Sequence, residues 1–544
     1  AVFRVCSLWF GNSTDEKVNG LVNAHIVKIP SHKWVTLIYQ IASRMSSGTE
    51  TFQRVLKALI ERIAVDHPYH SLYQIFALSN ADKVQSLGKS QYEMDVGKKA
   101  AAADLLHRLR DTEIGPVVAA MEPLVRQYIA VALMPLKHEA TKGVEELPLP
   151  AGLRSLKNLA EVPVVTAHIP LQPSALYENL VTVHSFSSRM KLVGGVHLPR
   201  LAVCRGSDGK SYRQLIKGND DLRQDAVMQQ MFHMVNTLLS ADPETRKRRL
   251  NVRTYKVVPL SPGAGILQWV ENTIPLTDYL IGHGRQVYDG AHLRYRPGDM
   301  LSISCRKMMM QAKDKLQAFK EVSEKFQPVF HHFFLEHYKQ PAQWFEKRID
   351  YTRSMASNSI VGYIVGLGDR HVTNILIDKS TAELVHIDLG VAFEQGKTLR
   401  VPETVPFRLT RDLVDAMGVT GTEGVYRRCC EETMRVLRQQ HEALLTIVEV
   451  FVHDPLYRWA LSPLRALALQ RADDDMEQSA SAGVATTDVA ARDAEKTLSR
   501  VRQKLQGVEH GGVTSVEEQI ALLIDEARDP ARLCHMFVGW RAWV

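Results

Sequence analysis

Three polar residues near the middle of the chain have the types and spacing that phosphoryl transfer requires. Asp369 is followed five residues later by Asn374, and Asp388 comes after the next apolar stretch. Phosphoryl transfer needs a carboxylate at the attacking hydroxyl and oxygen ligands for Mg²⁺, because its catalysis is mostly positioning and charge neutralisation. A base first, a metal ligand second and another metal-binding Asp after the next strand is the order in kinase catalytic loops. The spacing therefore predicts a phosphoryl-transfer site.

Each residue of this loop has an expected role. Asp369 should accept the proton of the substrate hydroxyl or orient that hydroxyl, and His371 should stabilise the developing charge or share the proton transfer. Asn374 and Asp388 should hold Mg²⁺, whose preference for oxygen ligands suits both side chains. Arg370 is expected to anchor the loop. Each residue alone could be a polar turn residue, but three in register between apolar segments favour the catalytic interpretation.

A lysine on an earlier strand is the candidate for neutralising nucleotide phosphates. Alternation along residues 212–217 puts Leu215 and Lys217 on one face of a strand and Ile216 in the core. A lysine held in this way needs an acidic partner. Asp225 is the candidate partner and Asp220 is the runner-up.

Other residues complete the expected nucleotide site. Gly194 and Gly195 lie between two predicted strands, where a loop could cover the phosphates, although a plain hairpin turn explains the pair equally well. Trp269 lies where the connection between two lobes is expected and could stack on adenine; the alternative is a core tryptophan. The remaining residues expected to contact the nucleotide are Tyr255, Leu267, Val270, Leu376 and Ile387.

The elements that position these residues follow from hydrophobic periodicity. Residues 1–140 show apolar side chains at helical spacing, as in Val55, Leu56, Leu59 and Ile60, and predict the end of an α-solenoid. From about residue 179 the period changes to two, and strands are predicted at residues 201–204, 212–217, 252–258 and 266–270, with a hairpin turn at 207–209. Helices return at about residues 305–365 and again at 516–527.

The expected fold class is α+β: a two-lobed kinase with a β-rich N-lobe and an α-rich C-lobe, preceded by α-solenoid helices and followed by a short helical tail. The expected parts are helices at 1–165, the N-lobe at 166–272, the C-lobe at 273–470, an insertion at 471–512 and the tail at 513–544. Residues 471–492 are acidic and then rich in Ala, Ser and Gly, which predicts a mobile segment. Trp540 and Trp543 are expected to pack the tail against the C-lobe near the loop after Asp388; the alternative is an exposed partner-binding tail.

Composition excludes several classes of protein. The 544 residues are 45% hydrophobic and 23% charged, and the net charge of +7 is modest, with dispersed basic residues. Six cysteines lack any Cys-x-x-Cys spacing, which argues against a metal site or a disulfide framework. No apolar run approaches the roughly 18 residues of a membrane span. Ala1 lies inside what reads as a helix, which is typical of the C-terminal part of a longer protein.

The motifs together resemble a known family. The usual kinase order His-Arg-Asp is reversed here as Asp369-Arg370-His371, which resembles the phosphatidylinositol 3-kinase superfamily. Further matches at residues 4–9, 255–260, 386–396, 402–412 and 539–540 make the chain similar, almost end to end, to phosphatidylinositol 3-kinase-related protein kinases with FAT and FATC regions. Leu389 replaces the Phe that usually follows the metal-binding Asp, which resembles the ATM (ataxia telangiectasia mutated) branch and its fungal orthologues. The N-terminal helices and residues 471–512 match poorly.

This resemblance implies a function and partners. Kinases of this kind use ATP with Mg²⁺ or Mn²⁺ and phosphorylate Ser or Thr followed by Gln. ATM-type members are nuclear, respond to DNA double-strand breaks through the MRN sensor complex and maintain telomeres in fungi. The resemblance therefore implies a homodimer, indirect contact with DNA and no membrane association. It also implies that the insertion at 471–512 can cover the substrate groove, whereas a simple disordered linker is the alternative.

Two other functions compete with this one. A lipid kinase of the same superfamily would carry a basic cluster after the metal-binding Asp, but only Lys397 and Arg400 are found there. A catalytically inactive scaffold is argued against by the intact Lys217, Asp369, Asn374 and Asp388.

Overall fold

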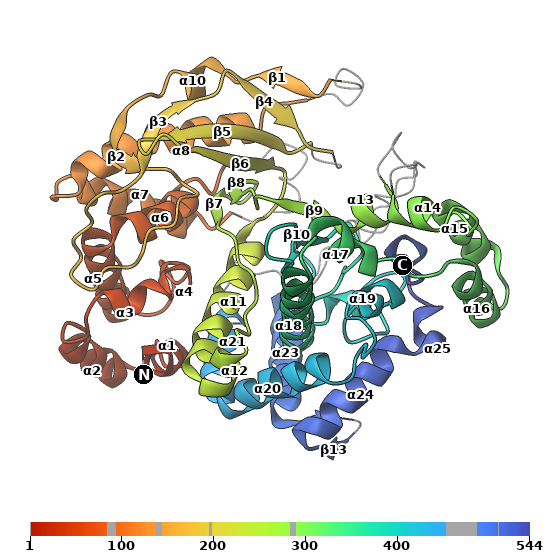
Figure 1. The fold of residues 1–544 in the computed structure, drawn as a ribbon. Coiled ribbons are helices and arrows are strands. Elements are labelled where there is room, and N and C mark those ends of the chain that lie inside the picture. Colours follow the sequence, from red (N-terminus) through yellow and green to blue (C-terminus); the bar gives the residue numbers. More distant parts are fainter. Residues whose placement is uncertain are drawn as a thin grey trace. The chain divides into compact units, whose positions relative to one another are not determined.

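The computed structural model describes residues 2–83, 94–136, 144–194, 198–282, 290–452, 487–509 and 511–544. The chain divides into two compact units (Figure 1). Unit 1 contains residues 1–230, 255–269 and 446–457, and unit 2 contains residues 231–254, 270–445 and 458–544. Helices α11 (Arg223–Ala241) and α21 (His441–Val452) include residues of both units.

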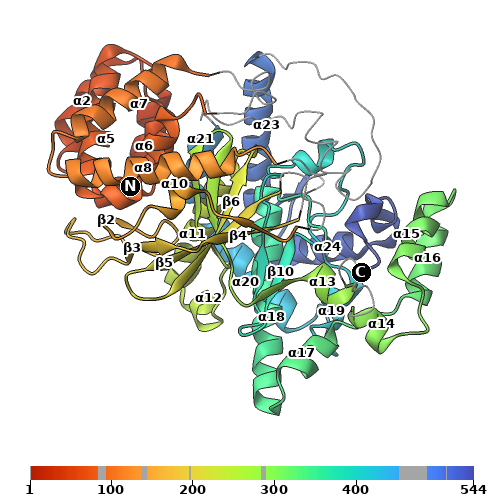
Figure 2. The same ribbon diagram turned by 90° about the horizontal axis from the view of Figure 1, so that it is seen from above.

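Unit 1 begins with helices, drawn in red and orange in Figures 1 and 2. They are α1 (Val2–Gly11), α2 (Glu16–Ile26), α3 (His32–Val35), α4 (Ile38–Ala42), α5 (Glu50–Asp66), α6 (Pro68–Ser79), α7 (Val96–Leu109), α8 (Gly115–Ala132) and α10 (Ala151–Arg154). In α5, the Thr49 hydroxyl caps the helix by accepting from the Phe52 amide, and the predicted stripe of Val55, Leu56, Leu59 and Ile60 is buried. The helix ends before Pro68, which begins α6.

The rest of unit 1 is an eight-stranded antiparallel sheet. Its strands are β1 (Glu146–Pro148), β2 (Leu159–Pro163), β3 (Thr182–Phe186), β4 (Arg189–Leu192), β5 (Arg200–Gly206), β6 (Ser211–Gly218), β7 (Val257–Ser261) and β8 (Ala264–Gln268). The main path runs β1-β4-β5-β6-β8-β7, and β3 pairs with both β2 and β5. The predicted turn at 207–209 is present between β5 and β6, where Gly209 has a φ of 76° that favours glycine.

The predicted strand at residues 252–258 is only partly correct, because β7 begins at Val257. Val252 still makes strand-like hydrogen bonds, but with a side chain. Its amide donates to Asn236 Oδ1 and its carbonyl accepts from Asn236 Nδ2, both at 2.8 Å.

Unit 2 is mainly helical. Its helices are α12 (Pro243–Lys247), α13 (Leu276–Leu280), α14 (Ala291–Tyr295), α15 (Ser302–Gln311), α16 (Lys315–Lys325), α17 (His331–His337), α18 (Pro341–Val365), α19 (Arg411–Asp415), α20 (Val425–Gln439), α23 (Thr487–Gln506), α24 (Val516–Arg528) and α25 (Pro530–Leu533), with 3-10 helices η2 (Gln395–Thr398) and η3 (Val538–Trp540). One sheet has the order β11 (Leu384–His386), β10 (Ile375–Asp378), β9 (Thr273–Pro275), and β12 (Val508–Glu509) pairs with β13 (Gly512–Val513). The C-terminal half of α18 is buried and packs against α20.

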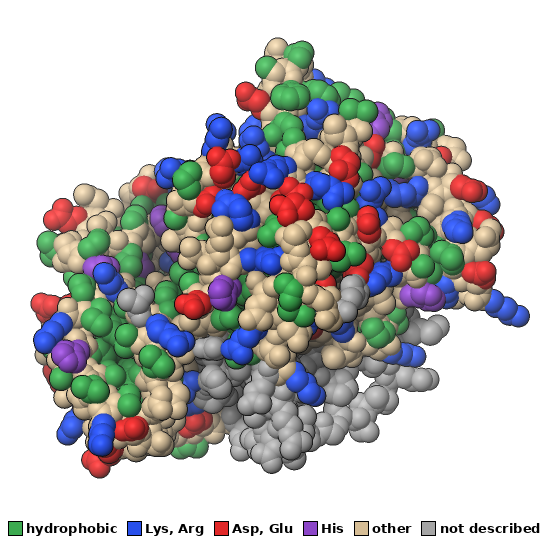
Figure 3. All heavy atoms as spheres, turned by 90° about the horizontal axis from the view of Figure 1, so that it is seen from below, with side chains coloured by type: hydrophobic (Ala, Val, Ile, Leu, Met, Phe, Trp, Pro, Cys, Tyr) green, Lys and Arg blue, Asp and Glu red, His purple; other side chains and the backbone are tan. Residues whose placement is uncertain are grey.

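These elements confirm the α+β class and the succession of helices, β-rich part, α-rich part and helical tail. The predicted tail helix at 516–527 corresponds to α24. The segment predicted to be mobile at 471–492 includes the start of α23 at Thr487, its residues 471–486 lie outside the described residues, and its mobility stays a prediction. All six cysteines are buried and carry free thiols. On the face drawn in Figure 3, basic and acidic side chains are intermixed. Within the described residues, no helix combines the length and apolar character needed to cross a membrane.

Candidate active site

The end of α18 and the β10–β11 hairpin bring the catalytic-loop residues together in unit 2. Helix α18 ends at Val365 and is capped by Gly366, whose φ of 60° is left-handed and whose missing side chain leaves room for the backbone of Glu394. In the hairpin, Ile375 pairs with His386, so that Asn374 and Ile387 follow at the same end; the Ile387 amide donates to the Asn374 carbonyl at 3.1 Å. Asn374 and Asp388 therefore lie at one end of a short, rigid hairpin.

Asp369 is held by both its backbone and its side chain. Its φ of 58° lies in the left-handed region, which is unfavourable for a residue other than glycine. Asn374 Nδ2 donates to the Asp369 carbonyl at 3.1 Å and to Asp369 Oδ2 at 3.3 Å. The Asp369 amide donates to Glu403 Oε1 at 2.9 Å. The candidate base is thus fixed before any substrate arrives.

The hydrogen bonds of His371 indicate its tautomer. Nδ1 accepts from the Thr373 amide at 3.3 Å, so the proton belongs on Nε2, which lies 3.9 Å from Asp369 Oδ1. Burial, reinforced by the nearby Arg370, lowers the pKa of His371 to about 3. At neutral pH the ring is therefore uncharged and offers Nε2–H as a hydrogen-bond donor beside Asp369.

The donor set fits a hard cation. Because Nδ2 of Asn374 faces Asp369, the amide oxygen of Asn374 remains as an acceptor, and Asp388 supplies a carboxylate. Both are oxygen ligands of the kind Mg²⁺ prefers, and nucleotide sites usually complete the shell with phosphate oxygens and water. Across the described ranges no group of three or more His, Cys, Asp or Glu could hold a metal by itself.

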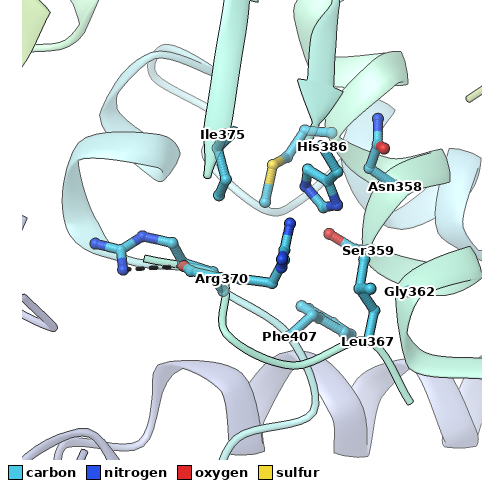
Figure 4. A pocket seen from close by; sticks show the side chains of 10 residues that line it. Asn358, Ser359, Gly362, Leu367, Arg370, Ile375, His386 and Phe407 are labelled. Carbon is cyan, nitrogen blue, oxygen red and sulfur yellow. Dashed lines mark hydrogen bonds between the residues drawn. The ribbon is translucent and has the colours of Figure 1, made fainter. Parts of the chain in front are cut away.

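Arg370 anchors the loop, as predicted. Its guanidinium donates to the carbonyls of Gly368 at 2.8 Å, Ile387 at 2.8 Å and Asp388 at 2.5 Å. One side chain thereby ties the loop of the candidate base to the turn that carries the candidate metal ligand. Figure 4 shows Arg370 entering a small pocket, with His386 facing it from β11 and Ser359 from α18.

In unit 1, β6 and β8 place the candidate nucleotide residues on adjacent strands. Leu215 pairs with Leu267 and Lys217 with Gly265, while Ile216 is fully buried, as the alternation predicted. Lys217 Nζ lies 3.4 Å from Asp220 Oδ2, so the runner-up is an observed partner. Asp225 is buried in the first turn of α11, and its pairing with Lys217 stays a prediction.

The other nucleotide candidates are placed as follows. Trp269 is half-buried, with the Arg213 guanidinium 5.5 Å from its ring, which disfavours the alternative of a core tryptophan. The Tyr255 amide donates to Gln229 Oε1 at 3.0 Å. Gly194 is exposed, and Gly195 lies outside the described residues. Val270, Leu376 and Ile387 belong to unit 2, and a single nucleotide pocket formed with the residues of unit 1 stays a prediction.

Sequence reasoning missed the groups that surround the loop. Glu403 bonds to Asp369, and His386 lines the pocket behind the loop, where burial lowers its pKa to about 3 and keeps it neutral. Glu403 lies within residues 402–412, a stretch that contributes to the family resemblance, but the sequence analysis assigned it no role. No local spacing indicates that its side chain reaches back to the catalytic loop.

The C-terminal tail packs within unit 2, as predicted. Trp540 is 3% exposed and Trp543 2% exposed. The Arg408 guanidinium donates to the carbonyls of Trp540 at 2.7 Å, Arg541 at 2.9 Å and Val544 at 2.7 Å, and it lies 4.2 Å from the Trp540 ring centroid. The same guanidinium donates to the Arg370 carbonyl at 3.4 Å. The tail is therefore buried against the segment that follows Asp388, and the exposed alternative is wrong.

Profiles of known protein families match the parts of the chain that carry the catalytic loop and the buried tail. A profile described as phosphatidylinositol 3- and 4-kinase matches residues 211–461, which include the whole catalytic loop. A FATC domain profile matches residues 513–544, which include the buried tail. The chain belongs to the phosphatidylinositol 3-kinase-related kinase family. A profile of HEAT repeats from ATR-like serine/threonine-protein kinases matches residues 17–104 of the chain. This agrees with the α-solenoid predicted for the N-terminal helices.

Similar proteins agree with this assignment. The chain is 50% identical to the serine/threonine-protein kinase ATM of Arabidopsis thaliana, 47% to the serine-protein kinase ATM of Sus scrofa and 38% to the kinase tel1 of Schizosaccharomyces pombe, in each case over 100% of the chain. It spans only 14%, 19% and 19% of those relatives. These protein-kinase relatives favour a protein kinase over a lipid kinase.

Solved structures extend the likeness to the fold. A structure titled "FAT and kinase domain of CtTel1" matches with a TM-score of 0.87 at 36% identity, over 100% of this chain and 36% of that one. A structure titled "Complete CtTel1 dimer with C2 symmetry" matches with a TM-score of 0.87 at 36% identity, over 100% of this chain and 19% of that one. The kinase fold expected from the sequence is confirmed. The finer boundaries at 165, 272, 470 and 512 stay predictions.

Proposed function

We propose that this chain is the catalytic part of a serine/threonine protein kinase that transfers the γ-phosphate of ATP to Ser or Thr followed by Gln. The observation that carries the proposal is the fixed carboxylate of Asp369, which Asn374 holds at the hairpin end from which Asp388 follows. That arrangement combines a group for the attacking hydroxyl with oxygen ligands for a cation, the two requirements of phosphoryl transfer.

The residues of the loop have distinct tasks in this mechanism. Asp369 orients the substrate hydroxyl and takes its proton as the oxygen attacks. The Nε2–H of neutral His371 donates a hydrogen bond to oxygen atoms that gain charge in the transition state. Asn374 and Asp388 would hold Mg²⁺ or Mn²⁺, and ATP with this cation supplies the phosphoryl group and the neutralising charge. Lys217, held by Asp220, would neutralise phosphate oxygens from the β6 strand.

The segment of residues 390–410, here called the activation segment, is the proposed peptide platform. Pro402 is exposed, and Val405 and Pro406 are half-buried, so they offer apolar surface near the candidate base. We expect Gln after the phosphoacceptor to be preferred over Ala by roughly tenfold or more, because a buried amide that makes hydrogen bonds is favoured by about 1 kcal/mol or more.

The names of the similar kinases support a proposal for the cellular role. We propose that the whole protein acts in the nucleus in DNA double-strand break signalling and telomere maintenance, and that an MRN-type sensor complex recruits it through parts outside this chain. We also propose a homodimer, which the titles of two similar structures support for Tel1.

Matched peptides test the proposed activity. The chain is assayed with MgATP on two peptides that differ only in Gln or Ala after the acceptor serine, and on phosphatidylinositol vesicles. We expect phosphorylation of the Gln peptide, a rate for the Ala peptide lower by about tenfold, and no lipid product. Equal peptide rates would overturn the specificity, a lipid product without peptide product would favour a lipid kinase, and ATP binding without any transfer would favour an inactive scaffold.

A further inference from the structure

Glu403 reaches from the activation segment to the catalytic loop. Its amide donates to the Gly396 carbonyl at 3.0 Å, which closes the intervening residues into a loop, and its side chain turns toward Asp369. Glu403 Oε1 then accepts from the Asp369 amide at 2.9 Å. One residue of the proposed peptide platform is thus hydrogen-bonded to the backbone of the candidate base.

Two glycines make room for this carboxylate. A Cβ on Gly368 would come within 2.6 Å of Glu403 Oε2, and a Cβ on Gly396 would come closer still. Neither glycine has a positive φ, so any residue could adopt its backbone conformation. What excludes a side chain at these two positions is the lack of space beside the Glu403 carboxylate. Burial raises the pKa of Glu403 to about 7, in keeping with a carboxyl enclosed by the two segments.

The hydrogen bond acts on a residue with an uncommon backbone conformation. Asp369 has a φ of 58°, a left-handed conformation that is uncommon for residues other than glycine, although aspartate adopts it more readily than most. Asn374 holds the carbonyl and the carboxylate of Asp369, and Glu403 holds its amide. Without the Glu403 side chain, the Asp369 amide loses its hydrogen bond to the activation segment.

We propose that Glu403 is a positioning residue that links the order of the activation segment to the geometry of Asp369. The inference rests on the proposed role of Asp369 in phosphoryl transfer. It predicts that a folded activation segment sets the candidate base, so that Glu403 matters even when no peptide is bound. If Glu403 only contacted the peptide, its removal would have no effect in the absence of peptide.

ATP hydrolysis without peptide separates the two roles. In the full chain, Glu403→Ala should lower kcat for hydrolysis by about tenfold to a hundredfold, because small misplacement of a catalytic group is costly. The KM for ATP should change by less than about twofold. Glu403→Gln should keep most of the activity, since its amide oxygen can still accept from Asp369. Glu324→Ala, at an exposed glutamate of α16, is the matched control and should behave as the wild type.

A second pair of variants tests the packing. Gly396→Ala should lower hydrolysis in the presence of Glu403, but it should add little to Glu403→Ala, because the larger carboxylate is then absent. Equal losses from Gly396→Ala in both backgrounds would overturn the proposed packing. If Glu403→Ala does not fold, Glu403→Asp keeps the charge but is too short to reach Asp369, and wild-type hydrolysis in that variant would overturn the proposal.

The failures are distinguishable. Loss of peptide phosphorylation with unchanged hydrolysis in Glu403→Ala would overturn the positioning role and leave peptide contact. Near-normal turnover in Asp369→Asn would instead overturn the proposed function itself.

Discussion

The buried Lys504 of α23 and the half-buried Glu394 of the activation segment form an ion pair within unit 2. The Lys504 side chain is 1% exposed and also donates to the Tyr363 carbonyl of α18 at 2.6 Å. Glu394 has a left-handed backbone, with a φ of 67°, and its amide donates to the Gly366 carbonyl at 3.1 Å. A helix that lies more than a hundred residues later in the sequence thus fixes the start of the activation segment.

Removal of Lys504 should destabilise the protein. Lys504→Met removes the buried partner of the half-buried Glu394, so we expect a cost of about 1–3 kcal/mol, below that of breaking a fully buried pair. Lys397 is a matched control because it pairs with the same carboxylate but is 56% exposed. Lys397→Met should cost less than about 1 kcal/mol. Chemical denaturation of both variants measures the difference, and equal costs would contradict the importance of burial.

The same pair predicts a dependence of stability on pH. Burial alone would raise the pKa of Glu394, but the charges of Lys504 and Lys397 outweigh burial and hold it at about 2, below the ordinary value of 4.5. A lowered pKa of a carboxylate stabilises the folded state fully above the unfolded value and less as pH falls from 4.5 toward 2. The difference in unfolding free energy between the wild type and Glu394→Gln should therefore shrink as pH falls through this window. A constant difference would show that the charge of Glu394 is not what stabilises the fold.

Residues that act within one short segment could be predicted from the sequence, and so could the packing of the tail through its two tryptophans, whereas individual hydrogen-bond partners in distant segments could not. Asp369, Asn374 and Asp388 are separated by a loop and one hairpin, so their spacing alone places them together. Glu403 and Asp369 are 34 residues apart, and no periodicity relates them.

Errors in the sequence analysis have local physical causes. For Lys217, the runner-up partner Asp220 lies 3.4 Å away, three residues further along the chain, while the preferred pairing with Asp225 stays a prediction. The strand predicted from residue 252 was partly wrong because the Asn236 side chain replaces a strand partner. A polar side chain that hydrogen-bonds to the backbone of a distant residue produces no periodic pattern in the sequence, so it cannot be predicted from hydrophobic spacing.

Substitutions of the two acidic site residues should separate chemistry from metal binding. Asp369→Asn should reduce turnover by several orders of magnitude with MgATP binding retained, and Asp388→Ala should reduce turnover similarly but weaken binding of the cation. Rapid-mix phosphorylation assays and a fluorescent ATP analogue, with Mg²⁺ titrated, measure both. Near-normal turnover in folded Asp369→Asn would refute the assigned role.

The region before α23 is the expected place of substrate control. Deletion of residues 475–486 leaves α23 and Lys504 in place. If this stretch covers the substrate groove, peptide phosphorylation should rise while the affinity for ATP stays within about twofold of the wild type. Peptide kinetics with the full chain and the deletion variant measure this directly. Unchanged kinetics would identify a simple linker.

The C-terminal tail should support activity without any partner protein. Arg408 donates to three tail carbonyls and also to the carbonyl of Arg370, so loss of residues 539–544 leaves a buried guanidinium without these acceptors beside the catalytic loop. A buried charged donor that loses its acceptors costs about 1–3 kcal/mol or more. Deletion of the six residues should therefore lower both the thermal midpoint and the rate of peptide phosphorylation. Val513→Ala, at an exposed position on β13, is a control that should change neither. Full activity of the truncated chain with an unchanged midpoint would show that the buried tail does not support the catalytic loop.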